Sequence, residues 1–205
     1  MGGQSLVSFG NNDARYSLTT MSTVSFASTL SKTMIIILAQ NDLDELKGRF
    51  PLLSSQEHTW FSFTPLFVED TSQNSITQVR ATAPVQATDF ILDTTRPTIR
   101  TYTLDMNALM VSLLFSESIK TSTVQLSELT VQSIETKRFG AHIVLNESSF
   151  TVGTGAGSNL LKVRIGEDSA AYMKLHGIGA AQSQSYLSWT DNFIADNSEN
   201  YLSPL

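Results

Sequence analysis

Residues 185–201 read SYLSWTDNFIADNSENY, and residues 59–75 carry the same pattern as TWFSFTPLFVEDTSQNS. Both strings run aromatic, apolar, Ser, aromatic, Thr, and continue through a Phe and a β-branched residue to Asp-x-Ser-x-Asn. Agreement over so specific a string marks an internal repeat, which sets the architecture before any single motif is interpreted. The chain is therefore predicted to contain two related structural units.

The alignment of the two copies continues upstream of these strings. The matched pairs include Tyr16 with Ile143, Leu18 with Leu145, Ile36 with Val163, Leu38 with Ile165 and Leu46 with Met173. The segment 93–132 before the second copy has no counterpart before the first, and the connector 85–93 has none after the second. We therefore expect a piece of a longer array, with an incomplete unit at 1–92 and a near-complete unit at 93–205.

Alternating apolar and polar residues, bounded by Pro97 and other turn-forming residues, predict a series of short strands. The predicted strands cover residues 100–104, 109–115, 129–134, 141–145, 149–152, 160–165 and 186–190. In the last of these, Ser188 is expected to face outward and the aromatic residues inward. The apolar run 35–38 is predicted to be a central strand that would pair with other chains if exposed, and the glycine-rich stretch 153–157 a hairpin loop.

Helical spacing of small and apolar residues predicts one short helical turn in each unit, at 41–47 and 167–175. Asp168 and Ser169 are candidate caps for the second turn. Many short strands, with one short helix between two late strands of each unit, predict an all-β fold. We expect two β-sandwiches of Greek-key type in tandem, the first lacking its opening strands.

The composition excludes several classes of function. A net charge of −6 and a pI near 5.0 argue against a nucleic-acid partner, which requires clustered Lys and Arg. There is no cysteine, so disulfides and thiolate metal sites are excluded. The longest apolar run, 34–39, is too short for a transmembrane helix, which needs about 20 residues. Few charges and roughly a quarter Ser and Thr favour a β-rich extracellular protein.

Several motifs resemble those of a known family. They are Asp-Thr-Thr at 93–95 with Pro97, Leu-Asp-Met-Asn at 104–107, Leu-Phe-Ser-Glu at 114–117, Tyr-Leu-Ser at 186–188 and the Asp-to-Asn string at 196–200. In these the chain resembles the tandem immunoglobulin-like repeats of large extracellular proteins of bacteria and aquatic eukaryotes, such as choanoflagellates, sponges and cnidarians. The resemblance implies a structural or adhesive array without enzymatic activity, at a cell surface or in an extracellular matrix.

The chain departs from that family at one position of each turn string. Where such repeats usually read Asp-x-Ala-Gly-Asn, this chain has Asp-Thr-Ser-Gln-Asn at 70–74 and Asp-Asn-Ser-Glu-Asn at 196–200, without the glycine. The departure leaves the type of turn open.

The acidic and amide side chains of these strings are the candidate metal ligands. Ca²⁺ is bound by six or more oxygens, and a Ca²⁺ site between repeats would use oxygens from the turn strings and from Glu117. The candidate ligands are Asp70, Asn74, Asp93, Asp196 and Asn200. Asp and Asn at this spacing also form Asx-turns that tighten a hairpin, and that structural interpretation is favoured.

Other candidate sites have weaker support. The repeat places none of the three histidines, His58, His142 and His176, opposite another, so no shared metal or acid–base site is expected, and no motif for a nucleophile, phosphate or zinc is found. Asn146 begins an Asn-Glu-Ser triplet, a candidate N-glycosylation site. The aromatic residues of the repeated strings are expected to lie in the core, and not on a carbohydrate-binding surface.

These observations predict a non-enzymatic structural protein that is extracellular and has no cofactor unless Ca²⁺ is bound. We expect self-association into a filament, matrix or biomineral scaffold, with silica as one mineral, and strand complementation between protomers. Other matrix proteins or a mineral surface are the expected partners. The alternative is a cell-surface adhesin or carbohydrate-binding module, in which Trp60 or Trp189 would contact the ligand.

Overall fold

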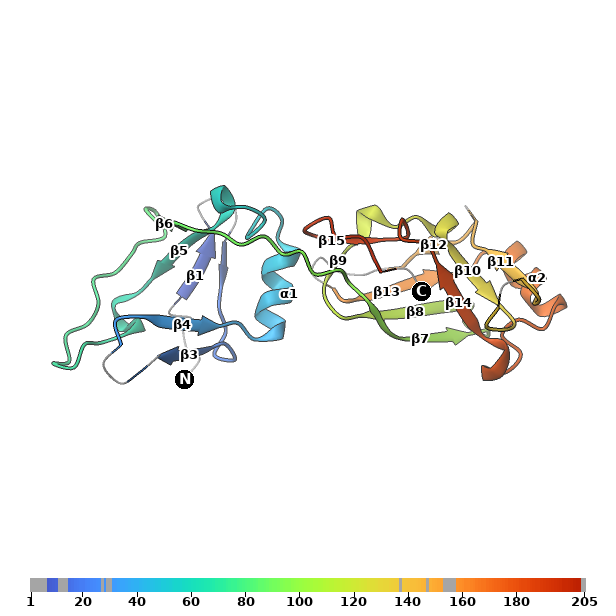
Figure 1. Cartoon of the computed structure of the whole chain (residues 1–205), viewed down its shortest axis with the longest axis horizontal. Coiled ribbons are helices and arrows are strands. Elements are labelled where there is room, and N and C mark those ends of the chain that lie inside the picture. The colour runs from blue at the N-terminus through green and yellow to red at the C-terminus, as the bar shows by residue number, and fades with distance from the viewer. Residues whose placement is uncertain are drawn as a thin grey trace. The chain divides into compact units, whose positions relative to one another are not determined.

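The computed structural model describes residues 7–10, 15–26, 28, 31–136, 138–146, 148–152 and 158–203. The chain divides into two compact units, residues 1–93 and 94–205, which we call unit 1 and unit 2 and describe separately. Among the described residues, strands in several small sheets predominate over two nine-residue α-helices (Figure 1). The predicted all-β fold class is confirmed at this level.

Unit 2 is built from two main sheets. Its elements are β7 (Ile99–Asp105), β8 (Met110–Phe115), β9 (Ile119–Lys120), β10 (Leu129–Gln132), β11 (His142–Val144), β12 (Phe150–Thr151), β13 (Leu160–Arg164), α2 (Glu167–Leu175), β14 (Tyr186–Trp189) and β15 (Ala195–Asp196), with short 3-10 turns at Thr121–Thr123, Leu126–Glu128 and Gln182–Gln184. One sheet has the order β12-β13-β8-β7 and the other β11-β10-β14, while β9 pairs with β15. All of these pairs are antiparallel.

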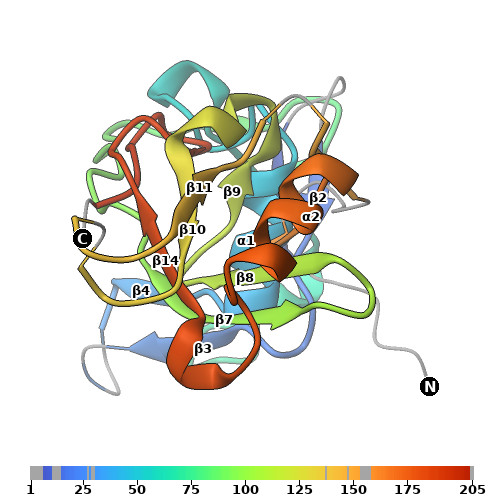
Figure 2. The ribbon, with the colours of Figure 1, turned by 90° about the vertical axis from the view of Figure 1, so that its right-hand side faces the viewer.

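The two main sheets of unit 2 enclose one hydrophobic core. Alternate residues of each strand share a face, and the inward faces of β8, β13 and β10 are fully apolar. These buried side chains are Val111, Leu113 and Phe115, then Leu161 and Val163, and then Leu129 and Val131. α2, in the foreground of Figure 2, contacts β11 and adds Ala170 and Met173 to the same core.

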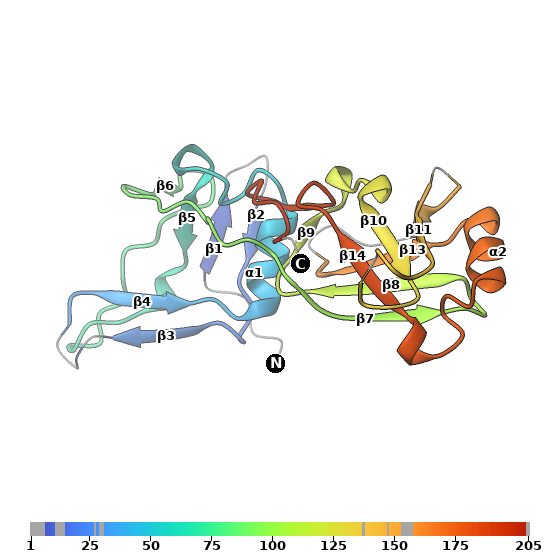
Figure 3. The ribbon, with the colours of Figure 1, turned by 45° about the vertical axis from the view of Figure 1, so that its right-hand side comes forward.

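Unit 1 contains a smaller set of elements. They are β1 (Val7–Gly10), β2 (Arg15–Ser17), β3 (Thr23–Phe26), β4 (Met34–Ile37), α1 (Gln40–Gly48), β5 (Trp60–Phe63) and β6 (Val85–Gln86), with 3-10 turns at Gln56–His58 and Pro65–Phe67. One sheet has the order β2-β1-β5-β6, and β3 and β4 form a separate two-stranded sheet (Figure 3). The described residues contain no further strand in this second sheet.

The two units repeat one topology. β1 pairs with β2 and β5, just as β10 pairs with β11 and β14. In both units a strand pair, β3–β4 or β12–β13, precedes the helix. The described part of unit 1 contains no counterpart of β7, β8 and β9, so its second sheet has half the strands of its equivalent in unit 2.

The core of unit 1 is correspondingly small. Its buried apolar residues are Leu18, Leu46 and Leu52. The first two occupy the positions aligned with Leu145 and Met173 of unit 2, so the repeat alignment identifies the same interior positions in both units.

Two details of the strand predictions were wrong. The run 35–38 is not a central strand, because β4 pairs only with β3 within the described residues. In β14, Ser188 faces away from the core as predicted and donates to Gln132 Oε1 at 2.8 Å, but Tyr186 shares its face. Strand side chains alternate, so Tyr186 and Trp189, three residues apart, point to opposite faces. Of these two aromatic residues, only Trp189 packs on the core, beside Leu187.

The helix predictions were correct in place but not in length or capping. Both segments form nine-residue helices, longer than a single turn. Neither Asp168 nor Ser169 caps α2, because the helix begins at Glu167 with Gly166 as the N-cap residue, two or three residues earlier than those caps require. The predicted hairpin loop at 153–157 lies outside the described residues. No helix in the described ranges has both the length and the apolar character needed to cross a bilayer.

Candidate functional site

The acidic turn of unit 1 is closed by its own hydrogen bonds. Asp70 Oδ1 accepts from the backbone N–H groups of Ser72 and Asn74, both at 2.8 Å, and Oδ2 accepts from Asn74 Nδ2 at 3.0 Å. The backbone N–H of Asp70 donates to the carbonyl of Asn74 at 2.9 Å. The bonds from the Asn74 side chain and backbone hold the pKa of Asp70 below its ordinary value. The Asx-turn interpretation is confirmed for this string.

The acidic turn of unit 2 repeats the same bonds. Asp196 Oδ1 accepts from the N–H groups of Ser198 at 2.9 Å and Asn200 at 2.7 Å, and Oδ2 accepts from Asn200 Nδ2 at 3.0 Å. Asp196 is fully buried, whereas Asp70 is exposed. The difference arises because Asp196 lies in β15, opposite Ile119 of β9, and the described part of unit 1 has no such partner strand.

One residue of each turn adopts the left-handed conformation. Gln73 has φ 64° and Glu199 has φ 66°. These are the positions where the resembling repeats carry glycine, which adopts positive φ without steric cost. The type of turn, which the sequence did not determine, is therefore the one that usually requires glycine. Here Gln73 and Glu199 adopt it.

The candidate calcium ligands do not all lie together. Within unit 2, carboxylate oxygens of the buried Glu117 and Asp196 lie within 4.8 Å of each other. Asp93, the last residue of unit 1, has Oδ2 at 2.6 Å from the ammonium of Lys47. Asp70 and Asn74 lie in the exposed turn of unit 1. Because each Asp carboxylate in a turn already accepts several bonds, calcium binding stays a prediction and is not required by the geometry.

The aromatic residues of the repeated strings pack mainly inward. Phe61, Phe63 and Phe67 pack on the core of unit 1, where the Phe9 and Phe61 ring centroids lie 5.6 Å apart. In unit 2, Phe193 is fully buried and Trp189 packs on the core.

The two indoles are engaged by backbone carbonyls. Trp60 Nε1 donates to the carbonyl of Glu57 at 2.7 Å, and Trp189 Nε1 donates to that of Ser203 at 2.9 Å. Both are half-buried, so neither presents an open ring and a free N–H together.

The histidines and the glycosylation candidate lie apart from these features. His58 Nδ1 is 3.0 Å from Ser55 Oγ, His142 Nδ1 is 3.2 Å from the carbonyl of Gly140, and His176 stacks on Tyr172. The side chain of Asn146 is exposed, and its Oδ1 accepts from the hydroxyl of Ser148 at 2.5 Å. Glycosylation of Asn146 stays a prediction.

Sequence reasoning missed a buried carboxylate in unit 1. Asp42, in the first turn of α1, is fully buried and accepts hydrogen bonds from Tyr16 Oη at 2.7 Å, Ser22 Oγ at 2.5 Å, and the N–H and Oγ1 of Thr19 at 3.1 and 3.0 Å. Burial opposes its charged form, but these bonds outweigh burial and lower the pKa of Asp42. Burial and the bond to Asp42 raise the pKa of Tyr16 to about 12. The aligned position in α2 is Ser169, so the repeat gave no sign of a carboxylate.

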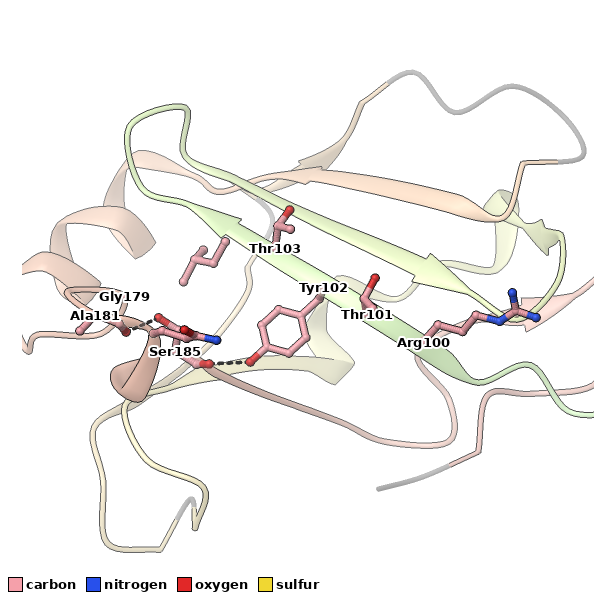
Figure 4. A pocket seen from close by; sticks show the side chains of 9 residues that line it. Arg100, Thr101, Tyr102, Thr103, Gly179, Ala181 and Ser185 are labelled. Atoms are coloured by element: carbon pink, nitrogen blue, oxygen red, sulfur yellow. Dashed lines mark hydrogen bonds between the residues drawn. The ribbon is translucent and has the colours of Figure 1, made fainter.

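A shallow groove of about 580 Å³ lies along the outer edge of β7 in unit 2. Tyr102 points into it and donates to the carbonyl of Ser185 at 2.5 Å, while Thr101 and Thr103 point to the opposite side of the strand (Figure 4). Burial, followed by the neighbouring Tyr186, raises the pKa of Tyr102. Gln182 and Arg100, whose guanidinium also donates to the carbonyl of Ser116 at 3.3 Å, complete a polar lining with hydrogen-bonding groups.

The most unusual surface is the β3–β4 pair of unit 1. Ile35 and Ile37 on β4 are 51% and 54% exposed, and Val24 and Phe26 on β3 are 44% and 49% exposed. A strand edge that is apolar and unpaired is a template for another strand, and proteins normally protect such edges. The predicted lack of any counterpart to 93–132 was wrong for 129–132, because β1 has the pairing of β10. The sequence signal for this surface was isoleucine at positions 35 and 37, where the aligned residues of the second copy are Lys162 and Arg164.

These features were compared with known proteins. No family model, no curated protein and no solved structure matches the chain, so its function is argued from the geometry described above.

Proposed function

We propose that the chain is a non-enzymatic structural protein whose two units are immunoglobulin-like repeats, and that it builds an extracellular filament, matrix or biomineral scaffold. The mechanism is strand complementation: an unpaired strand of one protomer is completed by a strand from another polypeptide. Assembly of this kind uses main-chain hydrogen bonds for affinity and side-chain alternation for specificity.

The proposal rests on the outer edge of β4, which pairs with no strand among the described residues. Its equivalent in unit 2, β13, pairs with strands on both sides, whereas β4 pairs with β3 alone within the described residues. The exposed isoleucines of β4 are aligned with Lys162 and Arg164 of β13. A strand with isoleucine in place of these charged residues favours association over solvation.

Concentration-dependent assembly is the direct test. The purified chain should form polymers or a lattice, visible by electron microscopy, with a sedimentation coefficient that rises with concentration. A chain that stays a fully folded monomer at high concentration would contradict the proposal. Introducing lysine at positions 35 and 37 should shift the material toward monomer without unfolding either unit, because both side chains are already exposed.

The biomineral scaffold in this proposal would be a protein assembly that binds silica. Ser and Thr make up roughly a quarter of the chain, few residues are charged, and exposed hydroxyls such as those of Thr101 and Thr103 suit hydrogen bonding to silanol groups. Incubation of the assembled protein with silicic acid should give protein-bound silica. Silica yield equal to that with an unrelated acidic protein would rule out this form.

The groove beside β7 favours a second candidate function, carbohydrate binding by an adhesin. Its lining of Tyr102, Arg100 and Gln182 provides a ring and several hydrogen-bonding groups. On a glycan array, Arg100→Ala with Gln182→Ala should abolish any binding, while Trp60→Phe should not change it. Binding that depends on Trp60 would instead support the ligand surface expected from sequence.

A further inference from the structure

The pairing of β13 in unit 2 shows what the edge of β4 lacks. β13 pairs antiparallel with β8, and Leu161 lies opposite Leu113, Lys162 opposite Ser112 and Val163 opposite Val111. The repeat alignment places Met34, Ile35 and Ile36 of β4 on those three residues of β13. A strand added to β4 in the same register would therefore place its inward residues opposite Met34 and Ile36.

The inward face of unit 1 has unfilled positions for such a strand. In unit 2, the three inward side chains of β8 are fully buried in the core. In unit 1, Val24 lies opposite Ile36 and Phe26 opposite Met34, so all four share one face. Met34 and Ile36 are only partly buried, whereas the aligned Leu161 and Val163 beside β8 are fully buried. An added strand would lie next to Met34 and Ile36 and complete their burial.

The outward residues of β4 indicate which side chains the added strand would carry. In unit 2 the outward residues of β13, Lys162 and Arg164, lie opposite Ser112 and Met110. Isoleucines at the aligned positions of unit 1 favour an apolar cross-strand neighbour over a charged one. The occupant is therefore expected to be apolar on its inner face and at one or more outer positions.

We propose that the edge of β4 (Met34–Ile37) that has no partner among the described strands is a docking site for a β-hairpin with the side-chain alternation of β7–β8. This deepens the proposed assembly and rests on it for its biological role. In a folded second copy β8 is held between β13 and β7 and places three buried residues in its own core. Polymerisation of the purified chain through this edge therefore requires another copy to release its β7–β8 hairpin, whereas a hairpin that is already unpaired binds directly.

A synthetic peptide with the sequence of residues 97–120 is the probe. Added to the full chain, it should bind with one-to-one stoichiometry in titration calorimetry and slow amide hydrogen exchange at 34–37. A second peptide, with serine at positions 111, 113 and 115, is the matched negative control and should bind at least ten-fold more weakly. Unchanged exchange at 34–37 under saturating peptide would overturn the proposal.

Two variants of the full chain locate the site. Met34→Lys places a charge opposite Leu113 of the peptide, on the inward face, and should weaken peptide binding at least ten-fold; Met34 is not among the residues packed in the core of unit 1. Ile91→Lys introduces the same charge outside β3 and β4, at a side chain that is 89% exposed, and should leave binding unchanged. Equal binding by both variants would overturn the proposal. Exchange rates in α1 should show that both remain folded.

The same experiment separates this inference from the proposed function. If the chain polymerises and the peptide blocks polymerisation, the docking site on β4 and the proposed assembly are both supported. A chain that polymerises while the peptide leaves β4 unprotected assembles through another surface, and the docking inference fails. A chain that binds the peptide at β4 but never polymerises retains the docking site, and the assembly role fails.

Discussion

β13 of unit 2 and β4 of unit 1 occupy the same place in two copies of one topology, yet their environments differ. β13 lies inside a four-stranded sheet and buries Leu161 and Val163 completely, whereas β4 lies at the edge of a two-stranded sheet and leaves the aligned Met34 and Ile36 only partly buried. The outward positions are exposed in both strands, but they carry isoleucine in β4 and charged residues in β13. Neighbouring strands therefore decide how completely the inward residues are buried, and the strand's own residues decide whether its outward face is apolar.

The largest expected effect is a difference in how much the two units lose in stability when a phenylalanine is truncated. Phe115→Ala should lower the free energy of unfolding of unit 2 by about 4 kcal/mol, because the side chain is fully buried and leaves a cavity. Phe26→Ala in unit 1 should cost less than about 1 kcal/mol, since half of that side chain is already in water.

The two tryptophans make this measurable, because Trp60 reports on unit 1 and Trp189 on unit 2. Urea unfolding would be followed by fluorescence in variants that retain one of them. Equal losses for the two Phe→Ala changes would show that unit 1 has a complete core.

The next effect concerns the helix position that differs between the units. Asp42→Ala should destabilise unit 1 by about 3 kcal/mol, because Tyr16, Ser22 and Thr19 would lose a buried charged acceptor. The matched change Ser169→Ala in unit 2 should be neutral or slightly stabilising, since its buried hydroxyl makes no hydrogen bond within the described residues. A comparable loss from both changes would contradict the special role of Asp42.

The same carboxylate makes unit 1 more sensitive to pH than unit 2. Because folding lowers the pKa of Asp42, its contribution is complete above the unfolded value of about 3.9 and is lost as the pH falls through the lower folded value. Folding raises the pKa of Tyr16 to about 12, so that contribution is complete below about pH 10 and is lost as the pH rises toward 12.

Hydrogen exchange of each unit between pH 3 and 7, corrected for the intrinsic rate, checks the acid limb. Unit 1 should lose protection first on acidification in the natural chain. In Asp42→Asn the acid-dependent step should disappear. Persistence of the step in that variant would assign it to another carboxylate.

The smallest effect tests the shared turn. Gln73→Gly should stabilise unit 1 by about 0.5 kcal/mol, because relief of a left-handed side chain outweighs the added freedom of the unfolded chain. Ser72→Gly, one residue earlier and without positive φ, should instead be destabilising by a similar amount. Thermal unfolding of the pair decides the sign, and a loss from Gln73→Gly would show that its side chain makes a compensating contact.

The elements of this protein were largely readable from sequence. The positions of β7, β8, β13 and both helices followed from periodicity, because alternation and helical spacing are local properties. The paired turns followed from Asp-x-Ser-x-Asn, since the carboxylate at the first position bonds the N–H groups of the next few residues. The edge of β4 was harder to predict from sequence, because the exposure of an apolar strand depends on neighbouring strands that are distant in the sequence.

The sequence by itself determined the repeat, the order of the strands and helices, and the interior positions that Leu18 and Leu46 share with Leu145 and Met173. The tertiary structure was needed to show that the isoleucine run of β4 lies at an edge, that the buried Asp42 accepts hydrogen bonds from four donor groups, and that Asp196 is buried while Asp70 is exposed. The reason is physical: side-chain periodicity is set within a segment, whereas burial is set by the segments that pack against it.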